Sequence, residues 1–174
     1  METWVHSEEI FKGDILSLWV GEVRLDNGAI YSREVVRHNG GVTIVPVLDD
    51  SVILIRQFRI AIEREILELP AGKLETGEAP EECARRELEE EIGYQAGELR
   101  LATSYYSCVG FSDEKIHIFL AFQLQKISQR LEPDERIQML KVPISEIERR
   151  LDRNEYEDAK TIIGLRELLA SLKR

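Results

Sequence analysis

Three acidic side chains in one stretch of the chain have the spacing of metal ligands. Glu87, Glu90 and Glu91 stand at positions i, i+3 and i+4, so on a helix they share one face. At the edge of a core, with an effective dielectric constant near 20 and a separation of about 6 Å, each pair repels by roughly 3 kcal/mol. Divalent cations such as Mg²⁺ or Mn²⁺ prefer clustered carboxylates and would neutralise this charge. A solvated acidic helix face is the alternative for such a run taken alone.

A turn and a helix must position these carboxylates. The turn covers residues 72–77, and a helix is predicted from about Glu78 or Ala79 to Gly93. Pro80 suits the first helical turn, where a missing N–H costs nothing, and glycine suits a left-handed cap. At about 100° per residue the helix has one apolar stripe, which would pack on a core and consists of Ala84, Leu88 and Ile92.

The spacing over residues 72–94 resembles the signature of the Nudix hydrolases, and we call this stretch the Nudix box. Only Tyr94 departs from the signature, at a position where the family usually has an aliphatic residue. The resemblance implies that the three carboxylates bind metal or act in catalysis, and that Arg86 and Glu78 form an ion pair. It also implies metal-dependent hydrolysis of a nucleoside diphosphate linked to another group. The matching positions are Gly72, Glu78, Arg86-Glu87-Leu88, Glu90-Glu91 and Gly93.

Composition and charge narrow the class of protein. With 174 residues, 43% hydrophobic and 32% charged, we expect one ordinary soluble domain with a substantial core. The net charge of −10 argues against binding nucleic acid through a basic surface. No apolar run approaches the length of a membrane span and the first residues do not resemble a signal peptide, so we expect no membrane association. The two cysteines, Cys83 and Cys108, make no disulfide framework and favour a cytoplasmic location.

The first forty residues form a segment of their own. Residues 15–25 and 29–37 look extended on either side of Asp26-Asn27-Gly28, which is a strong hairpin signal. We therefore expect residues 1–40 to form a small antiparallel sheet, set before a Nudix hydrolase domain of residues 41–174. This hairpin has more apolar residues than a free ribbon should expose to water, so it is a candidate dimerisation element. The alternative is that it folds back on its own domain.

The rest of the chain predicts a mixed sheet between helices. Segments 42–48 and 52–58 are nearly continuous in apolar residues, as is typical of central strands covered on both faces. Ser145 with Glu148 predicts a capping box for a helix that ends near Arg153. Together with the resemblance, this gives an α/β fold of the Nudix type, an α/β/α sandwich after the small amino-terminal sheet. The remaining predicted elements are strands over 66–69, 99–106, 116–124 and 137–142, and a helix over 158–172.

Four further segments resemble the branch that contains ADP-ribose pyrophosphatases and nucleoside diphosphate sugar hydrolases. They are residues 56–59, 68–72, 110–114 and 158–161. This resemblance implies that the carbonyl of Ala71 is a metal ligand and that Glu114 contacts the terminal ribose. It also implies that an acid on a later loop helps to activate water, a role for which Glu135 is the candidate and Glu132 the rival.

One position leaves the substrate open. Members that prefer ADP-ribose usually have a proline before residues 110–114, where this chain has Val109. Another nucleoside diphosphate sugar, such as GDP-mannose, is therefore an alternative substrate. A catalytically silent Nudix module that binds nucleotides as a regulator is a second alternative. A structural acidic domain is a third.

We predict a mechanism with two or more Mg²⁺ or Mn²⁺ ions at Glu87, Glu91 and the Ala71 carbonyl, with Glu90 sharing a metal or orienting the water. The products would be a nucleoside monophosphate and a sugar phosphate. Arg59 either binds phosphate or pairs with Glu68. In a homodimer, residues of the amino-terminal hairpin would reach the nucleotide of the partner. The candidate substrate-binding residues are Glu114, Arg33, Arg59, Tyr31 and Glu68.

Overall fold

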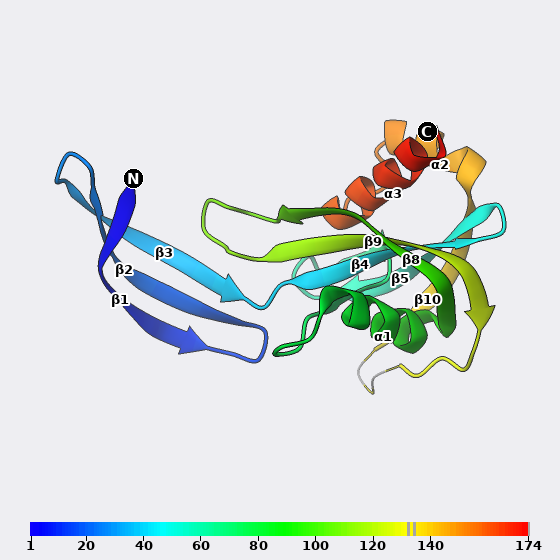
Figure 1. Cartoon of the computed structure of the whole chain (residues 1–174), viewed down its shortest axis with the longest axis horizontal. Coiled ribbons are helices and arrows are strands. Elements are labelled where there is room, and N and C mark those ends of the chain that lie inside the picture. The colour runs from blue at the N-terminus through cyan, green and yellow to red at the C-terminus, as the bar shows by residue number, and fades with distance from the viewer. Residues whose placement is uncertain (132, 134, 174) are drawn as a thin grey trace. The chain divides into compact units, whose positions relative to one another are not determined.

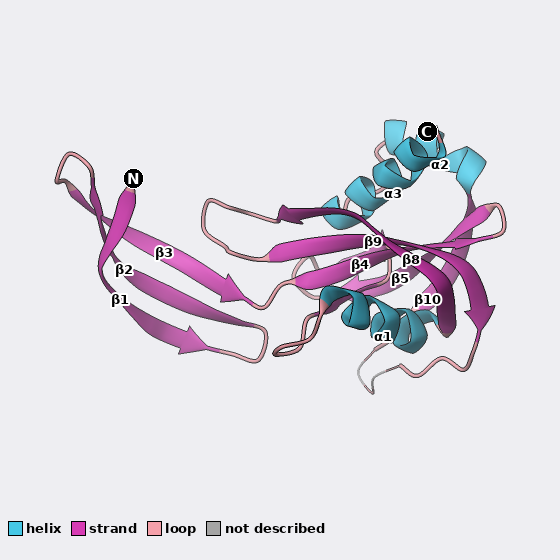
Figure 2. Cartoon of the chain, in the orientation of Figure 1, coloured by secondary structure: helices cyan, strands magenta, loops and turns pink. Residues whose placement is uncertain are grey.

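The computed structural model describes residues 1–131, 133 and 135–173, and its elements are shown in Figures 1 and 2. The chain divides into two compact units. The first consists of residues 1–40 and 105–116, and the second of residues 41–104 and 117–174. None of the helices in the described part of the chain is long and apolar enough to cross a membrane.

The first unit is built on a three-stranded antiparallel sheet in the order β1-β2-β3. Its strands are β1 (Glu2–Lys12), β2 (Leu16–Leu25) and β3 (Ile30–His38). The hairpin predicted between β2 and β3 is present, with Gly28 at φ 84° in the turn. Strand β1 was not predicted. All of its residues are exposed, so the sequence there has no one-sided apolar pattern to mark a strand.

The loop that joins β8 (Tyr94–Tyr106) to β9 (Lys115–Lys126) belongs to the same unit and is hydrogen-bonded to β3. The Val36 N–H donates to the Phe111 carbonyl at 2.7 Å, and Asp113 Oδ1 accepts the His38 N–H at 2.9 Å. The other oxygen of Asp113 accepts from Arg37 at 2.9 Å. These bonds fix residues 110–114 against the carboxyl end of β3.

Large apolar side chains of the first unit are open to solvent. Eight of them on or beside the three strands are each 38% exposed or more. A sheet of three short strands that shows this much apolar surface needs a further surface to cover it. The eight are Trp4, Val5, Ile10, Phe11, Ile15, Leu16, Ile30 and Tyr31.

The second unit contains the larger mixed sheet. Its strand order is β10-β5-β4-β9-β8, with β6 paired to β5 and β7 paired to β4. The strands are β4 (Gly41–Leu48), β5 (Ser51–Arg59), β6 (Arg64–Glu68), β7 (Ala71–Lys73), β8 (Tyr94–Tyr106), β9 (Lys115–Lys126) and β10 (Gln138–Pro143). The helices are α1 (Pro80–Ile92), α2 (Ile144–Asp152) and α3 (Ala159–Leu172).

Helices cover both faces of this sheet. Helix α1 lies on one face, with α2 and α3 on the other (Figure 1). Val42 and Ile44 of β4 belong to one core cluster with Leu88 of α1. Val45 points the other way, towards Gly164 of α3, because successive side chains of a strand alternate between faces. The predicted α/β fold, with a mixed sheet between helices and a small antiparallel sheet before it, is confirmed.

Local predictions failed at three places in this unit. The capping box of Ser145 is wrong, because α2 begins directly after Pro143 without a side-chain cap. The Ile144 N–H instead donates to the Asp50 carbonyl at 2.8 Å, which ties the helix start to the β4–β5 turn. The short strand β7 and the first five residues of β8 were also missed. Both segments contain glycine and polar residues, which give no strand pattern in the sequence, and pairing with neighbouring strands stabilises them.

Candidate active site

Helix α1 presents its acidic face at a fixed rotation. Pro80 occupies the first helical position, and Gly93 ends the helix in the left-handed conformation at φ 68°, donating its N–H to the Glu89 carbonyl. Side chains of the predicted apolar stripe, Ala84, Leu88 and Ile92, are buried, together with Cys83. Burial of this stripe leaves Glu87 and Glu91 facing strand β7.

These two carboxylates are buried. Glu87 is 8% exposed and Glu91 only 3%. The Ala71 N–H donates to Glu91 Oε2 at 2.9 Å. A Cβ on Gly72 would lie 1.8 Å from Glu87 Oε1, so only glycine allows the β7 backbone to come this close to Glu87. The glycine and the acids of the Nudix box therefore form one packed unit.

Burial makes the charged forms of both acids costly. Loss of solvent raises the pKa of Glu91 to about 8, against the lowering effect of the Ala71 N–H. The pKa of Glu87 is also raised by burial, although the neighbouring Arg86 lowers it. The Glu135 carboxylate raises the pKa of both groups, so the later loop places this acid near the box.

Arg86 binds three acidic side chains. Its Nε and Nη2 donate to the two oxygens of Glu78 at 2.9 and 3.1 Å. Its Nη1 donates to Glu87 at 2.7 Å and to Glu90 at 3.1 Å. The bond from Arg86 lowers the pKa of Glu78 to about 2. The guanidinium thus joins the loop before α1 to the helix and compensates part of the negative charge.

The donor set fits a hard divalent cation, although the side chains are not arranged as a closed cage. Within the described residues, no three acidic, His or Cys side chains converge closely enough to hold a metal ion. Glu87 and Glu90 are turned towards Arg86, and Glu91 towards Ala71. Clustered carboxylate oxygens are nevertheless the ligands that Mg²⁺ and Mn²⁺ prefer, and a bound ion would compensate the charge that burial makes costly on Glu87 and Glu91.

Comparison with known proteins decides the family. Residues 37–164 match the profile of the NUDIX domain. The chain belongs to the Nudix family. An ADP-ribose pyrophosphatase of Bacillus subtilis (strain 168) is 41% identical to this Nudix chain over 170 residues, which cover 96% of this chain and 92% of the relative. A GDP-mannose pyrophosphatase of Escherichia coli (strain SMS-3-5 / SECEC) is 35% identical over 154 residues, covering 81% of this chain and 79% of the relative.

A solved structure supports the same assignment. The crystal structure of an ADP compounds hydrolase superposes on this chain with a TM-score of 0.90. It is 25% identical in sequence, and the match covers 99% of this chain and 94% of the other. Both the fold and the Nudix box are therefore those of a Nudix pyrophosphohydrolase.

Two of the candidate substrate-binding residues, Arg59 and Glu68, form an ion pair with each other. Arg59 donates from Nε to Glu68 Oε2 at 2.9 Å, and its Nη2 lies 2.7 Å from the same oxygen. Glu68 is 4% exposed, and its other oxygen accepts from Lys160 at 3.0 Å. Of the two predicted roles for Arg59, the structure favours pairing with Glu68.

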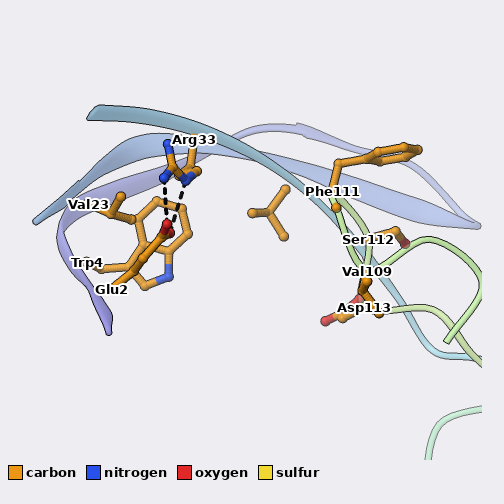
Figure 3. A pocket seen from close by; sticks show the side chains of 10 residues that line it. Glu2, Trp4, Val23, Arg33, Val109, Phe111, Ser112 and Asp113 are labelled. Carbon is orange, nitrogen blue, oxygen red and sulfur yellow. Dashed lines mark hydrogen bonds and ion pairs between the residues drawn. The ribbon is translucent and has the colours of Figure 1, made fainter. Parts of the chain in front are cut away.

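The remaining substrate-binding candidates lie in the first unit. Arg33 on β3 donates to both oxygens of Glu2, at 2.6 and 3.0 Å. The pair lines a hollow together with Trp4, Phe111, Ser112 and Asp113 (Figure 3). The sequence alone singles out neither Glu2 nor Trp4. No local pattern marks strand β1, which brings Glu2 within hydrogen-bond distance of Arg33.

Three candidates have less defined surroundings. Tyr31 is an exposed β3 residue two positions from Arg33, and so on the same face of the strand. Glu114 lies with Oε1 3.7 Å from His38 Nδ1. Glu132, the rival of Glu135 as base, lies outside the described residues.

The raised pKa of Glu91 predicts a pH-dependent stability. Because the folded-state pKa of Glu91 is raised from 4.5 to about 8, its contribution is fully present below pH 4.5 and is lost as the pH rises through about 8. Glu91→Gln should therefore melt at a progressively higher temperature than wild type between these pH values in buffer with a chelator. Thermal unfolding from pH 4.5 to 9 measures this difference. The exposed Glu81→Gln serves as the control and should follow wild type, whereas parallel profiles for wild type and Glu91→Gln would contradict the assignment.

Proposed function

We propose that this Nudix enzyme hydrolyses the diphosphate bond of ADP-ribose or a related nucleoside diphosphate sugar with the help of Mg²⁺ or Mn²⁺. The products are a nucleoside monophosphate and a sugar phosphate. The observation that carries the proposal is the pair of buried carboxylates, Glu87 and Glu91, packed against Gly72 and Ala71. The similarity to relatives named for ADP-ribose and GDP-mannose supports this class of substrate.

The proposed ion ligands are Glu87, Glu91 and the Ala71 carbonyl, with Glu90 beside them. When bound, two or more ions would supply positive charge to the diphosphate oxygens and promote ionisation of the attacking water. Burial of the two carboxylates excludes competing water, and the Ala71 N–H holds Glu91 in place. Glu135 accepts the proton of the water as a new P–O bond forms and the bridging P–O bond breaks.

Arg33 is the better placed of the two arginines to bind a substrate phosphate. Its partner Glu2 is an exposed residue, and exposed ion pairs contribute little to stability, so a phosphate could displace Glu2 at small cost. Removing Arg59 from the nearly buried Glu68 would cost more, because a buried charge would lose a partner. We propose that Arg33 and Tyr31 contact the substrate, that Glu114 contacts its ribose, and that Arg59 and Glu68 mainly support the site.

Both cysteines are free, Cys83 buried and Cys108 exposed. Burial raises the pKa of Cys83 to about 12, so its thiol is inert. Free thiols suit a reducing compartment, and we propose that the enzyme works in the cytoplasm.

A substrate panel tests the proposed reaction. Wild-type protein with Mg²⁺ should cleave ADP-ribose, GDP-mannose or both, and chromatography of the products should show a nucleoside monophosphate and a sugar phosphate. Glu91→Gln should lower kcat by two orders of magnitude or more, since it removes a buried ligand. Glu81→Gln on the same helix should retain wild-type kcat. Turnover of Glu91→Gln close to wild type, or a folded wild type that binds nucleotides without cleaving them, would contradict the proposal.

A second experiment tests the proposed base. Glu135→Gln should lower kcat by about 10²- to 10⁴-fold while KM changes little, because a general base acts in the transition state. Steady-state kinetics on the better substrate of the panel measures both constants. Glu132→Gln is the matched control on the same loop. If that variant loses activity and Glu135→Gln does not, the role moves to Glu132.

The exposed apolar side chains of the first unit support a homodimer in which this unit contributes to the site of the partner. Light scattering should give twice the chain mass of 20.1 kDa at assay concentrations. An equal mixture of Glu91→Gln and Arg33→Ala subunits should then recover up to about a quarter of wild-type activity, because half of the dimers would contain one intact site. A fully active monomer, or a mixture that exchanges subunits without recovering activity, would exclude shared sites.

A further inference from the structure

The link between β6 and β7 is held by three different elements at three consecutive residues. The Leu69 N–H donates to Thr161 Oγ1 of α3 at 2.9 Å. The Ile44 N–H of β4 donates to the Pro70 carbonyl at 2.8 Å. The Ala71 N–H donates to Glu91 of α1 at 2.9 Å. Because α1 and α3 lie on opposite faces of the sheet (Figure 1), this short link is fixed from both sides.

The contact from α3 has a defined direction. Asp158 caps the helix, and its Oδ2 accepts from both the N–H and the hydroxyl of Thr161, at 2.9 and 2.6 Å. A hydroxyl has a single hydrogen, so the one on Thr161 is used by Asp158 and its oxygen is left to accept from Leu69. Thr161 is fully buried, and the bond therefore has no competition from water.

Lys160 makes a second connection between the first turn of α3 and the end of β6. Its Nζ donates to Asp158 Oδ1 at 2.9 Å and to Glu68 Oε1 at 3.0 Å. Glu68 is the last residue of β6, and its other oxygen is held by Gln57 and Arg59. The first turn of α3 thus contacts two consecutive residues at the start of the link. Lys160 forms an ion pair with Glu68, and Thr161 accepts a hydrogen bond from the Leu69 N–H.

Packing alone would hold α3 on the sheet. Leu165 and Leu168 are fully buried, and Gly164 is so close to Leu69 that an added Cβ would lie 2.6 Å from its Cδ1. Buried ionic groups are a weak source of stability, since well-packed apolar residues often replace them without loss. The polar groups of the first turn of α3 add a fixed position for the backbone of residues 69–71.

We propose that Asp158, Lys160 and Thr161 form a positioning group that sets the Ala71 carbonyl and the Glu91 carboxylate for metal binding. This inference rests on the proposed function, because it takes these two groups as metal ligands. The three residues do not touch substrate. They act through Leu69 and Glu68 on the strand that follows.

The test compares Thr161→Val with two matched variants. Thr161→Ser retains the hydroxyl. Thr43→Val makes the same change at another fully buried threonine, directly opposite Ala71 in the β4–β7 ladder, whose Oγ1 has no hydrogen-bond partner among the described residues. Titration calorimetry measures the Kd for Mn²⁺ on each full-length protein, and thermal unfolding in chelator measures stability.

Thr161→Val should raise the Kd for Mn²⁺ about tenfold or more, while Thr161→Ser and Thr43→Val stay within about threefold of wild type. The Mn²⁺ concentration for half-maximal hydrolysis should rise in parallel, and excess Mn²⁺ should restore most of kcat. If Thr161→Val does not fold, Lys160→Met takes its place in the test. Lys160→Met should raise the Kd for Mn²⁺ at least threefold, whereas Lys160→Arg, which keeps the positive charge, should leave it near the wild-type value.

An unchanged Kd in a folded Thr161→Val, even with a lower melting temperature, overturns the inference and leaves the proposed function intact. An equal loss of affinity in Thr43→Val also overturns it, since the effect would then come from packing. Wild type that neither binds Mn²⁺ nor hydrolyses the panel overturns the proposed function, and this inference with it.

Discussion

The structure depends on placing two carboxyl groups next to each other out of water. Glu87 and Glu91 are almost fully buried, and the β7 backbone can lie this close to Glu87 only because residue 72 is a glycine. Burial raises the pKa of both acids, to about 8 for Glu91. A fold selected for stability alone would not retain this arrangement, since burying ionisable groups is costly and Arg86 compensates only part of the negative charge. The cost is understandable if a divalent cation binds there during the reaction.

The elements around the box hold the acids in this costly position. The apolar stripe of α1 fixes its rotation, Arg86 ties the preceding loop to the helix through Glu78, and the strand ladder of β4 fixes β7. Helix α3 adds a hydrogen bond from the opposite face of the sheet, through Thr161. The site is therefore assembled from both layers of helices and the strand between them, and it does not belong to the Nudix box alone.

The sequence predicts best where a pattern is local. Helix α1 follows from Pro80, Gly93 and the apolar stripe, and the covered strands β4 and β5 follow from their continuous apolar runs. The fold class and the family followed from the box and are confirmed. Strand β1 was missed because no residue of it is buried, and the capping box of Ser145 was wrong because Pro143 leads directly into α2. The contacts of Thr161 with Leu69 and of Glu2 with Arg33 join residues far apart in sequence, so no local pattern could reveal them.

The central claim is that a divalent cation replaces the proton that burial keeps on Glu91, and proton release on binding tests it most directly. Calorimetric titration with Mn²⁺ at pH 7, in two buffers of different ionisation enthalpy, gives the number of protons released. With a pKa of about 8, Glu91 is mostly protonated at pH 7, so wild type should release close to one proton, and fewer as the pH is raised past 8. Glu91→Gln should release almost none. Tight Mn²⁺ binding by wild type at pH 7 without proton release would contradict this account.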